Sequence, residues 1–266
     1  MAAPMSDKVL RLLVKIERAN QHAADLFTRL SAFFDTNPYQ VVIEDDPRTG
    51  DRVFRLHKVA DVPLEIAAAI GDIVHNLRAS LDHLACQLVL ANGETPTRQT
   101  AYPVCKDAQE YTAKRTAKKV KGMSCAAVQL IDATRPYKGG NDDLWRLNEL
   151  DIIDKHRLLL AVGGLCPIMV LDFTPLVRHN HPNLRDVRLP VIPLSTTRGL
   201  AIVEDGAEIH RVPRFAEHPD MHTQPEFPPD VAVNEPTVGP AESVFEMLKK
   251  FYHLVGGIIG RFQHLL

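Results

Sequence analysis

Cysteine is scarce in this chain and is never closely paired. Only four of the 266 residues are cysteines, at positions 86, 105, 125 and 166. Structural zinc sites usually use closely spaced Cys-x2-Cys pairs. The spacing therefore argues against such a site and predicts reduced thiols in the core, with neither a metal nor another cofactor.

The sequence also lacks a long apolar run and an excess of either charge. No window reaches the roughly 18 consecutive apolar residues of a membrane-spanning helix, and the start, MAAPMSDK, lacks the pattern of a signal peptide. We therefore expect a soluble cytoplasmic protein without a membrane partner. The 31 Lys and Arg residues nearly balance 33 Asp and Glu residues, so any contact with nucleic acid must come from a local basic patch.

Several motifs of common enzymes are absent. There is no glycine-rich nucleotide-binding loop, no Gly-x-Ser-x-Gly elbow and no His-Glu-x-x-His sequence. Nucleotide-binding proteins and hydrolases of those classes are therefore unsupported. The 45% hydrophobic and 24% charged residues are typical of a soluble globular protein with a sizeable core.

The longest helix signal comes first. Apolar residues between positions 5 and 34 recur in alternating steps of three and four, which places them on one side of a helix as a heptad seam. Asn37-Pro38 ends this helix, because proline forces the preceding residue out of the helical region. Two β-prone runs, 39–45 and 52–59, then predict a hairpin. The seam residues are Val9, Leu12, Ile16, Ala19, Ala23, Leu26, Leu30 and Phe33.

A second helix is predicted from Asp61, as its N-cap, to Ala91, with Pro63 in the first turn and Asn92-Gly93 after its end. Seven apolar residues fall within about 40° of one line along this helix, so they define the face that meets the core. They are Ile66, Ile70, Ile73, Leu77, Leu81, Leu84 and Leu88.

The rest of the chain divides at residue 160. Helices are expected at 107–120, 125–134 and 142–160, whereas 161–240 contains 12 of the 19 prolines and short β-prone runs. Residues 241–266 form a closing helix that packs back on the core, and its glycines, 256, 257 and 260, would let another backbone approach closely.

This order of elements predicts an α+β fold with a central bundle of about six helices. Residues 1–160 form the helical core with the inserted hairpin 39–59, and 161–240 form a section rich in strands and loops. We expect these parts and the closing helix to form one integrated domain.

Polar residues form two stripes beside the apolar face of the second helix. Asp72, Asn76 and His83 make one stripe, and His75, Arg78 and Asp82 make the other. Arg78 and Asp82 are four residues apart, so the simplest interpretation is an ion pair on the helix. The histidines in the same interpretation bind a neighbouring carbonyl group or face water.

The helix at 142–160 carries carboxylates among apolar residues. Asp151 and Asp154 project between leucines, and a buried carboxylate must be paired, hydrogen-bonded or protonated. Possible partners are Lys155, Arg157 and a cation of the second helix. The cluster is either an ion-pair network that locks two helices together or a pocket for acid–base or phosphate-binding work.

Two segments of the chain resemble known families. NLRASLDHL at 76–84 and LWRLNELDIIDKHR at 144–157 look like an uncharacterised group of bacterial hypothetical proteins, over much of the first 160 residues. That likeness implies no activity. Arg78, four further residues and His83 resemble the Arg-x4-6-His motif of HEPN-domain ribonucleases, helical proteins common in bacterial toxin–antitoxin and defence systems.

The second resemblance implies a metal-independent endoribonuclease, or an RNA-binding protein, that acts as a homodimer. Arg78 would hold the scissile phosphate and His83 would be the general acid or base. Because these side chains lie about 140° apart on a straight helix, a second subunit or a distorted helix must complete the site. The supporting residues would be His75, Asn76, Asp82, Asp151, Asp154 and His156. The predicted contacts to RNA phosphates are Lys114, Arg115, Lys118 and Lys119.

Two other hypotheses compete with the ribonuclease. The chain could be a non-catalytic helical binding or assembly protein whose buried polar helix is structural. It could also be a metal-dependent hydrolase, with His75, His83, Asp154 and His156 as ligands. The heptad seam of the first helix could serve a dimer interface or be buried within one chain.

Overall fold

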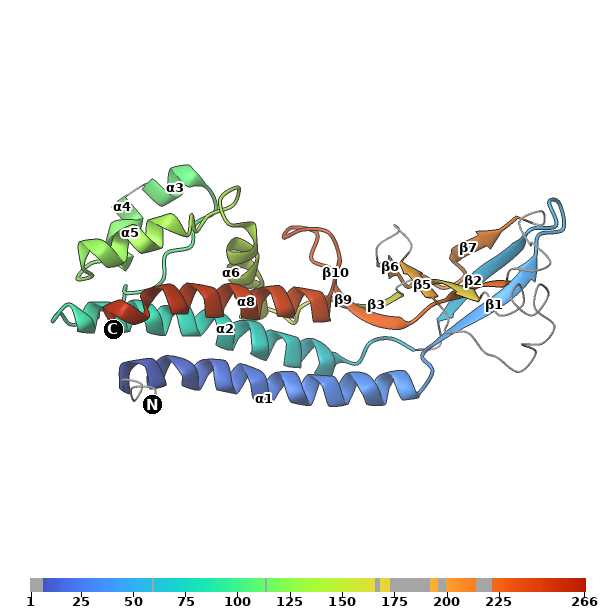
Figure 1. Ribbon diagram of the computed structural model, residues 1–266, viewed down its shortest axis with the longest axis horizontal. Coiled ribbons are helices and arrows are strands. Elements are labelled where there is room, and N and C mark those ends of the chain that lie inside the picture. The colour runs from blue at the N-terminus through green and yellow to red at the C-terminus, as the bar shows by residue number, and fades with distance from the viewer. Residues whose placement is uncertain are drawn as a thin grey trace, which may run out of the picture.

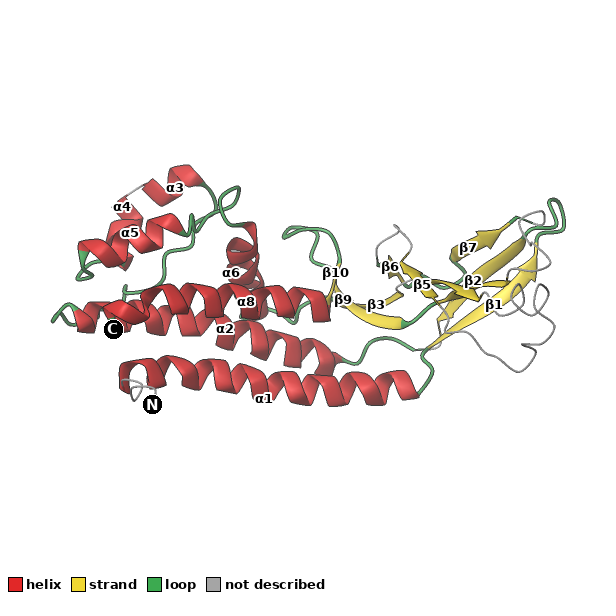
Figure 2. Cartoon of the chain, in the orientation of Figure 1, coloured by secondary structure: helices red, strands yellow, loops and turns green. Residues whose placement is uncertain are grey.

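The computed structural model describes residues 7–58, 60–112, 114–165, 168–172, 192–195, 200–213 and 222–266. The molecule is elongated, with helices at one end and strands at the other (Figures 1 and 2). This separation confirms the predicted α+β class.

Two long antiparallel helices, α1 (Asp7–Asp35) and α2 (Leu64–Ala91), form the base of the helical end. All seven predicted core residues of α2 are at most 2% exposed. The seam of α1 packs into the same core, where Ala19, Leu26 and Phe33 are buried. The described side chains of the heptad seam therefore pack in the core of the same chain. The side chains of Val9 and Leu12 are not among those that the structure describes.

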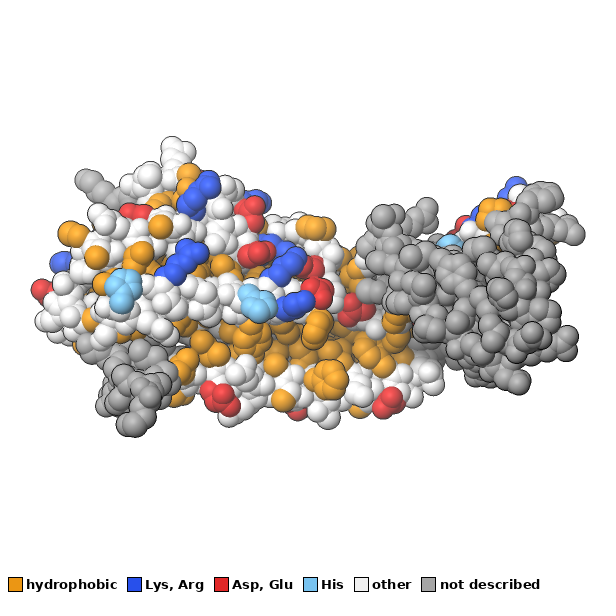
Figure 3. Space-filling model, viewed as in Figure 1, with side chains coloured by type: hydrophobic (Ala, Val, Ile, Leu, Met, Phe, Trp, Pro, Cys, Tyr) orange, Lys and Arg blue, Asp and Glu red, His pale blue; other side chains and the backbone are white. Residues whose placement is uncertain are grey.

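The closing helix α8 (Val244–Phe262) returns along α2 and is followed by a short 3-10 turn, η3 (Gln263–Leu265). Helix α6 (Asp142–Asp154) contacts both α2 and α8. Three short helices complete this end: α3 (Ala108–Thr112), α4 (Lys114–Lys119) and α5 (Cys125–Ala133). Hydrophobic side chains remain visible along the line between α1 and α8 (Figure 3).

Three small sheets form the other end, and every described strand pair is antiparallel. The first has the order β1-β2-β7, with bounds Tyr39–Asp45, Arg52–Lys58 and Glu208–Val212. The second is β10-β9-β3-β6, with bounds Glu242–Ser243, Pro229–Val233, Ala161–Leu165 and Ala201–Ile202. The third is β5-β4-β8, with bounds Ile192–Ser195, Ile168–Asp172 and His222–Glu226.

The predicted hairpin is confirmed as β1 and β2, with Val42 opposite Arg55. A small apolar cluster of Leu56, Leu165 and Val203 joins it to the later strands. The hairpin and the described strands from β3 onward therefore meet at one β-rich end, although the hairpin and β3 are more than a hundred residues apart in the sequence.

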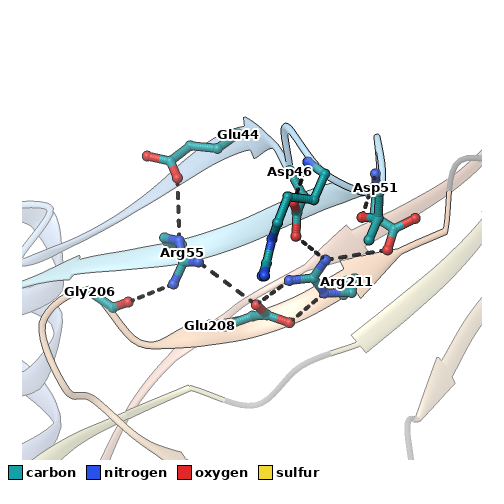
Figure 4. Close-up of polar contacts among 9 residues, drawn as sticks. Glu44, Asp46, Asp51, Arg55, Gly206, Glu208 and Arg211 are labelled. Atoms are coloured by element: carbon teal, nitrogen blue, oxygen red, sulfur yellow. Dashed lines mark hydrogen bonds and ion pairs between the residues drawn. The ribbon is translucent and has the colours of Figure 1, made fainter.

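Ion pairs hold the tip of the hairpin to β7 (Figure 4). Arg211 Nη1 donates to Asp46 Oδ2 at 2.9 Å and to Asp51 Oδ2 at 3.3 Å, and its Nε and Nη2 donate to the carboxylate of Glu208. Backbone N–H donation from Arg48, with further hydrogen bonding from Arg211, lowers the pKa of Asp46 to about 2. These contacts satisfy a group of carboxylates that would otherwise repel one another.

Several predicted helix boundaries are wrong. The predicted helix 142–160 ends at Asp154, and the leucines that continue its pattern lie between α6 and β3, where the backbone N–H of Leu160 donates to Glu235. The start of α2 has Pro63 at the N-cap, without a side-chain cap, and Asp61 pairs with Lys58 instead. The closing helix begins at Val244, because Glu242 and Ser243 pair with β9.

The predicted helix 107–120 consists of two short helices, α3 and α4. Residue 113 between them lies outside the described residues. None of the residues of α3 is buried, so this short helix has no apolar face packed on the core.

The buried carboxylate of Glu235 binds residues at the junction between the helical end and the strands. Arg157 donates to both oxygens of Glu235, with Nη1 at 2.9 Å and Nη2 at 2.7 Å, and the backbone N–H of Leu160 donates to the same carboxylate at 2.8 Å. Glu235 is 3% exposed. The ion pair therefore fixes the chain where it leaves α6 against the segment after β9.

We expect Glu235→Gln to lower the free energy of unfolding at pH 7 by about 1.5–3 kcal/mol, since it weakens hydrogen bonds to a charged group. Hydrogen bonding from Arg157 lowers the pKa of Glu235. The stabilisation is therefore complete above its unfolded pKa and is lost as the pH falls through the lower folded pKa. Urea unfolding between pH 7 and pH 3 should show the two proteins converging in stability. Glu246→Gln, at an exposed site on α8, is the control, and a gap that does not depend on pH would contradict the assignment.

Candidate functional site

The predicted site residues gather where α6 packs on α2, in two separate polar groups. The Arg78 cluster comprises Arg78, Asp82, Asn148 and the backbone of Tyr102. The Asp151 cluster comprises His22, Asp72, His75, Asp151, Asp154 and Lys155. Both lie against the apolar face of α2, so their polar groups need partners.

Each nitrogen of the Arg78 guanidinium has a protein acceptor. Nε donates to Asn148 Oδ1 at 3.0 Å, Nη1 to Asp82 Oδ1 at 2.7 Å and Nη2 to the Tyr102 carbonyl at 3.0 Å. Asp82 Oδ1 also accepts the backbone N–H of Tyr102 at 2.9 Å. Arg78 is only 6% exposed, so it joins α2, α6 and the loop before α3 from inside the protein.

The two residues of the predicted catalytic pair have different environments. Arg78 is buried, and the predicted ion pair with Asp82 is confirmed. His83 is exposed on α2. Because five residues turn a helix by about 140°, the described chain does not direct both side chains to one point.

Asp151 is the buried centre of the second cluster, with 3% of its surface exposed. Its Oδ1 lies 2.8 Å from His75 Nδ1, and its Oδ2 accepts from Lys155 Nζ at 2.6 Å. The side chains of His75 and Lys155 are 47% and 52% exposed. The predicted pairing of Asp151 with Lys155 is therefore confirmed, and the carboxylate also orients an imidazole at the surface.

Asp154 lies against α2 at Gly71. A Cβ at position 71 would stand 2.0 Å from Asp154 Oδ1, so the absence of a side chain there makes room for the carboxyl group. Burial raises the pKa of Asp154, and the carboxylates of Asp72 and Asp151 raise it further. The predicted partner of Asp154, Arg157, binds Glu235 instead. The reason is that α6 ends before Arg157 can take up a helical position beside Asp154.

The other predicted site residues belong to neither the Arg78 cluster nor the Asp151 cluster. Buried Asn76 donates to the carbonyl of Asp72 at 2.8 Å and accepts from Lys15 at 3.4 Å. His156 is exposed after the end of α6. Lys118 and Lys119 lie on the separate short helix α4, and the side chains of Lys114 and Arg115 are outside the description.

The hypothesis of a metal-dependent hydrolase predicts a cluster of metal ligands. Within the described ranges, no group of three or more His, Cys, Asp and Glu side chains is arranged to hold a metal ion. Cys86, Cys105 and Cys125 are free thiols, and Cys125 is exposed rather than in the core as expected. Cys166 falls outside the described residues.

A groove between α1 and α8 is a further candidate site that the sequence reasoning missed. Its volume is about 310 Å³, and Phe27 and Phe245 at its edges are 72% and 67% exposed. The Tyr252 hydroxyl is buried without a hydrogen-bond partner in the described structure. Burial, with the nearby Glu17 carboxylate, raises the pKa of Tyr252 to about 12. The residues that line the groove include Phe27 of α1 and Phe245, Lys249 and Tyr252 of α8.

The sequence carried only a partial signal for these additional residues. Asn148 stands three residues before Asp151 on the predicted buried helix, so it was available as a polar partner. The carbonyl of Tyr102 and the groove have no such signal, because they depend on which segments the fold brings together.

Comparisons with family models, curated proteins and solved structures found no match to this chain. Among the described helices, none combines the length and apolar character needed to span a bilayer.

We expect Arg78→Met to lower the free energy of unfolding by about 3 kcal/mol, because it leaves three buried or half-buried acceptors without their donor. His83→Ala should change it by less than about 0.5 kcal/mol, since His83 is exposed. Urea denaturation followed by circular dichroism gives both values. Equal stabilities of the two variants would contradict the structural role of Arg78.

Asp154→Asn should stabilise the protein at neutral pH. Because folding raises the pKa of Asp154, the native protein becomes less stable as the pH rises from the unfolded pKa through the folded value. An amide keeps the shape and removes that penalty. The midpoint of urea unfolding should rise at pH 7, and the gain should vanish below about pH 3.8. A gain that persists at low pH would show another cause.

Proposed function

We propose that this chain is a non-catalytic helical binding or assembly protein, in which the polar groups between α2 and α6 hold the helices together. The observation that carries this proposal is the Arg78 guanidinium, buried and donating from every nitrogen to the protein. A phosphate would have to displace acceptors from this group. Hydrogen bonds to charged groups contribute about 1.5–3 kcal/mol each, so such displacement is costly.

A separate surface for binding lies between α1 and α8. The groove between α1 and α8 exposes two phenylalanines at its edges, and hydrophobic side chains line it (Figure 3). Contiguous exposed apolar surface rimmed by polar residues is typical of protein interaction sites. This groove supports a binding role that needs no reacting group.

The metal-independent ribonuclease stays a prediction, and one contact favours acid–base chemistry. The half-exposed imidazole of His75 is oriented by buried Asp151, an arrangement that general bases often use. Lys155 on the same carboxylate would supply a cation for a phosphate. A ribonuclease built here would depend on His75 rather than on the Arg78 and His83 pair alone.

Incubation of cellular RNA with the purified protein, with and without EDTA, tests the proposal. We expect no cleavage above the buffer blank by the wild-type protein, nor by Arg78→Lys, His83→Ala and His75→Ala variants whose folding circular dichroism has verified. Cleavage that resists EDTA and is lost in His83→Ala and Arg78→Lys would establish the predicted catalytic pair and overturn the proposal. Loss in His75→Ala alone would overturn it in favour of the Asp151 cluster.

A further inference from the structure

The outer side of α8 carries a second seam of residues, apart from the one in the core. Phe245, Lys249, Tyr252 and Gly256 follow one another in steps of four, three and four. At 100° per residue they lie within about 60° of one another. We call these four residues the outer seam. Such spacing on an exposed helix face is typical of packing against a further helix.

Three glycines of α8, at positions 256, 257 and 260, are exposed with open space around them, and only Gly256 lies in the outer seam. Gly256 lies inside α8 and is exposed, and a Cβ there would meet nothing within 4 Å. Glycine in a helix interior is less favourable than alanine, because its backbone loses more conformational freedom on folding. Within the described chain nothing packs closely against Gly256. The missing side chain leaves a notch in the surface of α8, into which a side chain of another helix could fit.

We propose that a second copy of this chain packs its α8 antiparallel on the outer seam, so that Phe245 of each copy fills the notch at Gly256 of the other. This inference rests on the proposed assembly function. A two-fold axis between residues 250 and 251 exchanges 245 with 256 and 249 with 252. The spacing of the seam reads the same in both directions, as a two-fold interface between identical surfaces requires.

Charge selects the antiparallel arrangement. Lys249 of one copy then lies over Tyr252 of the other, beside the Glu17 carboxylate that acts on this tyrosine. Glu17 is exposed on α1, and no described side chain forms an ion pair with it. The ammonium group of Lys249 from the other copy would supply that partner. A parallel pairing would instead place Lys249 against Lys249 and repel.

The pairing also covers the exposed aromatic surface. Phe27 and Phe245 lie at the edges of the same groove, and among the described residues Lys249 forms one ion pair, a 3.8 Å contact to Glu246. Exposed pairs of that kind contribute little, so Lys249 is available to turn toward a second copy. The two grooves would meet as one apolar layer between four helices, α1 and α8 of each copy.

Sedimentation velocity of the full chain at about 1 to 100 µM tests the pairing. We expect a concentration-dependent dimer, with a Kd at least about tenfold weaker for Gly256→Gln. Gly257→Gln is the matched control, because Gly257 is also exposed on α8 with open space around it but lies outside the seam. Its Kd should stay within about twofold of the wild-type value.

Charge exchange tests the orientation of the two helices. Lys249→Glu should weaken the dimer, and Glu17→Lys combined with Lys249→Glu should restore it. A wild-type monomer at the highest concentration, or a dimer unaffected by Gly256→Gln, would overturn the pairing. RNA cleavage that depends on Arg78 and His83 would overturn the proposed function without changing sedimentation, so the two failures are distinguishable.

Discussion

The burial of α2 is the constraint on which the rest of the helical end depends. Helices α1, α6 and α8 all pack on it, and its core residues are almost completely removed from water. Removing apolar area from water is the main favourable contribution to folding. The same burial makes every polar group on α2 costly unless it is paired. Arg78 is the strongest example, since its position between three elements is tolerable only because each nitrogen has an acceptor.

The polar groups between α2 and α6 show how structure and chemistry compete for the same residues. A guanidinium whose hydrogen bonds are complete stabilises the helices but is not free to bind a phosphate. The Asp151 cluster is different, because its buried carboxylate holds two half-exposed cationic or titratable groups at the surface. The Asp151 cluster therefore keeps polar side chains at the surface, whereas the guanidinium of the Arg78 cluster is used inside the protein.

Long-range ion pairs join the helical end to the strands. Arg157 binds Glu235 after β9, and Arg146 on α6 binds Glu242 of β10, just before the closing helix, where Lys250 also contacts the carboxylate. These contacts fix how the chain leaves α6 and how it returns as α8. The helical end is therefore closed around elements that are far apart in sequence, and the face of α8 away from α2 is left for other contacts.

The sequence by itself determined the α+β class, the hairpin, the core face of α2 and the pairs Arg78–Asp82 and Asp151–Lys155. Periodicity and four-residue spacing are local properties, so they survive folding. Tertiary structure decided the partners contributed by Asn148, Tyr102 and Glu235, the end of α6 and the groove between α1 and α8. Those features depend on long-range packing, which local patterns do not encode. The leucines after Asp154 fit a helical period, yet the helix ends before them, and the backbone N–H of Leu160 donates to Glu235 instead of to the helix.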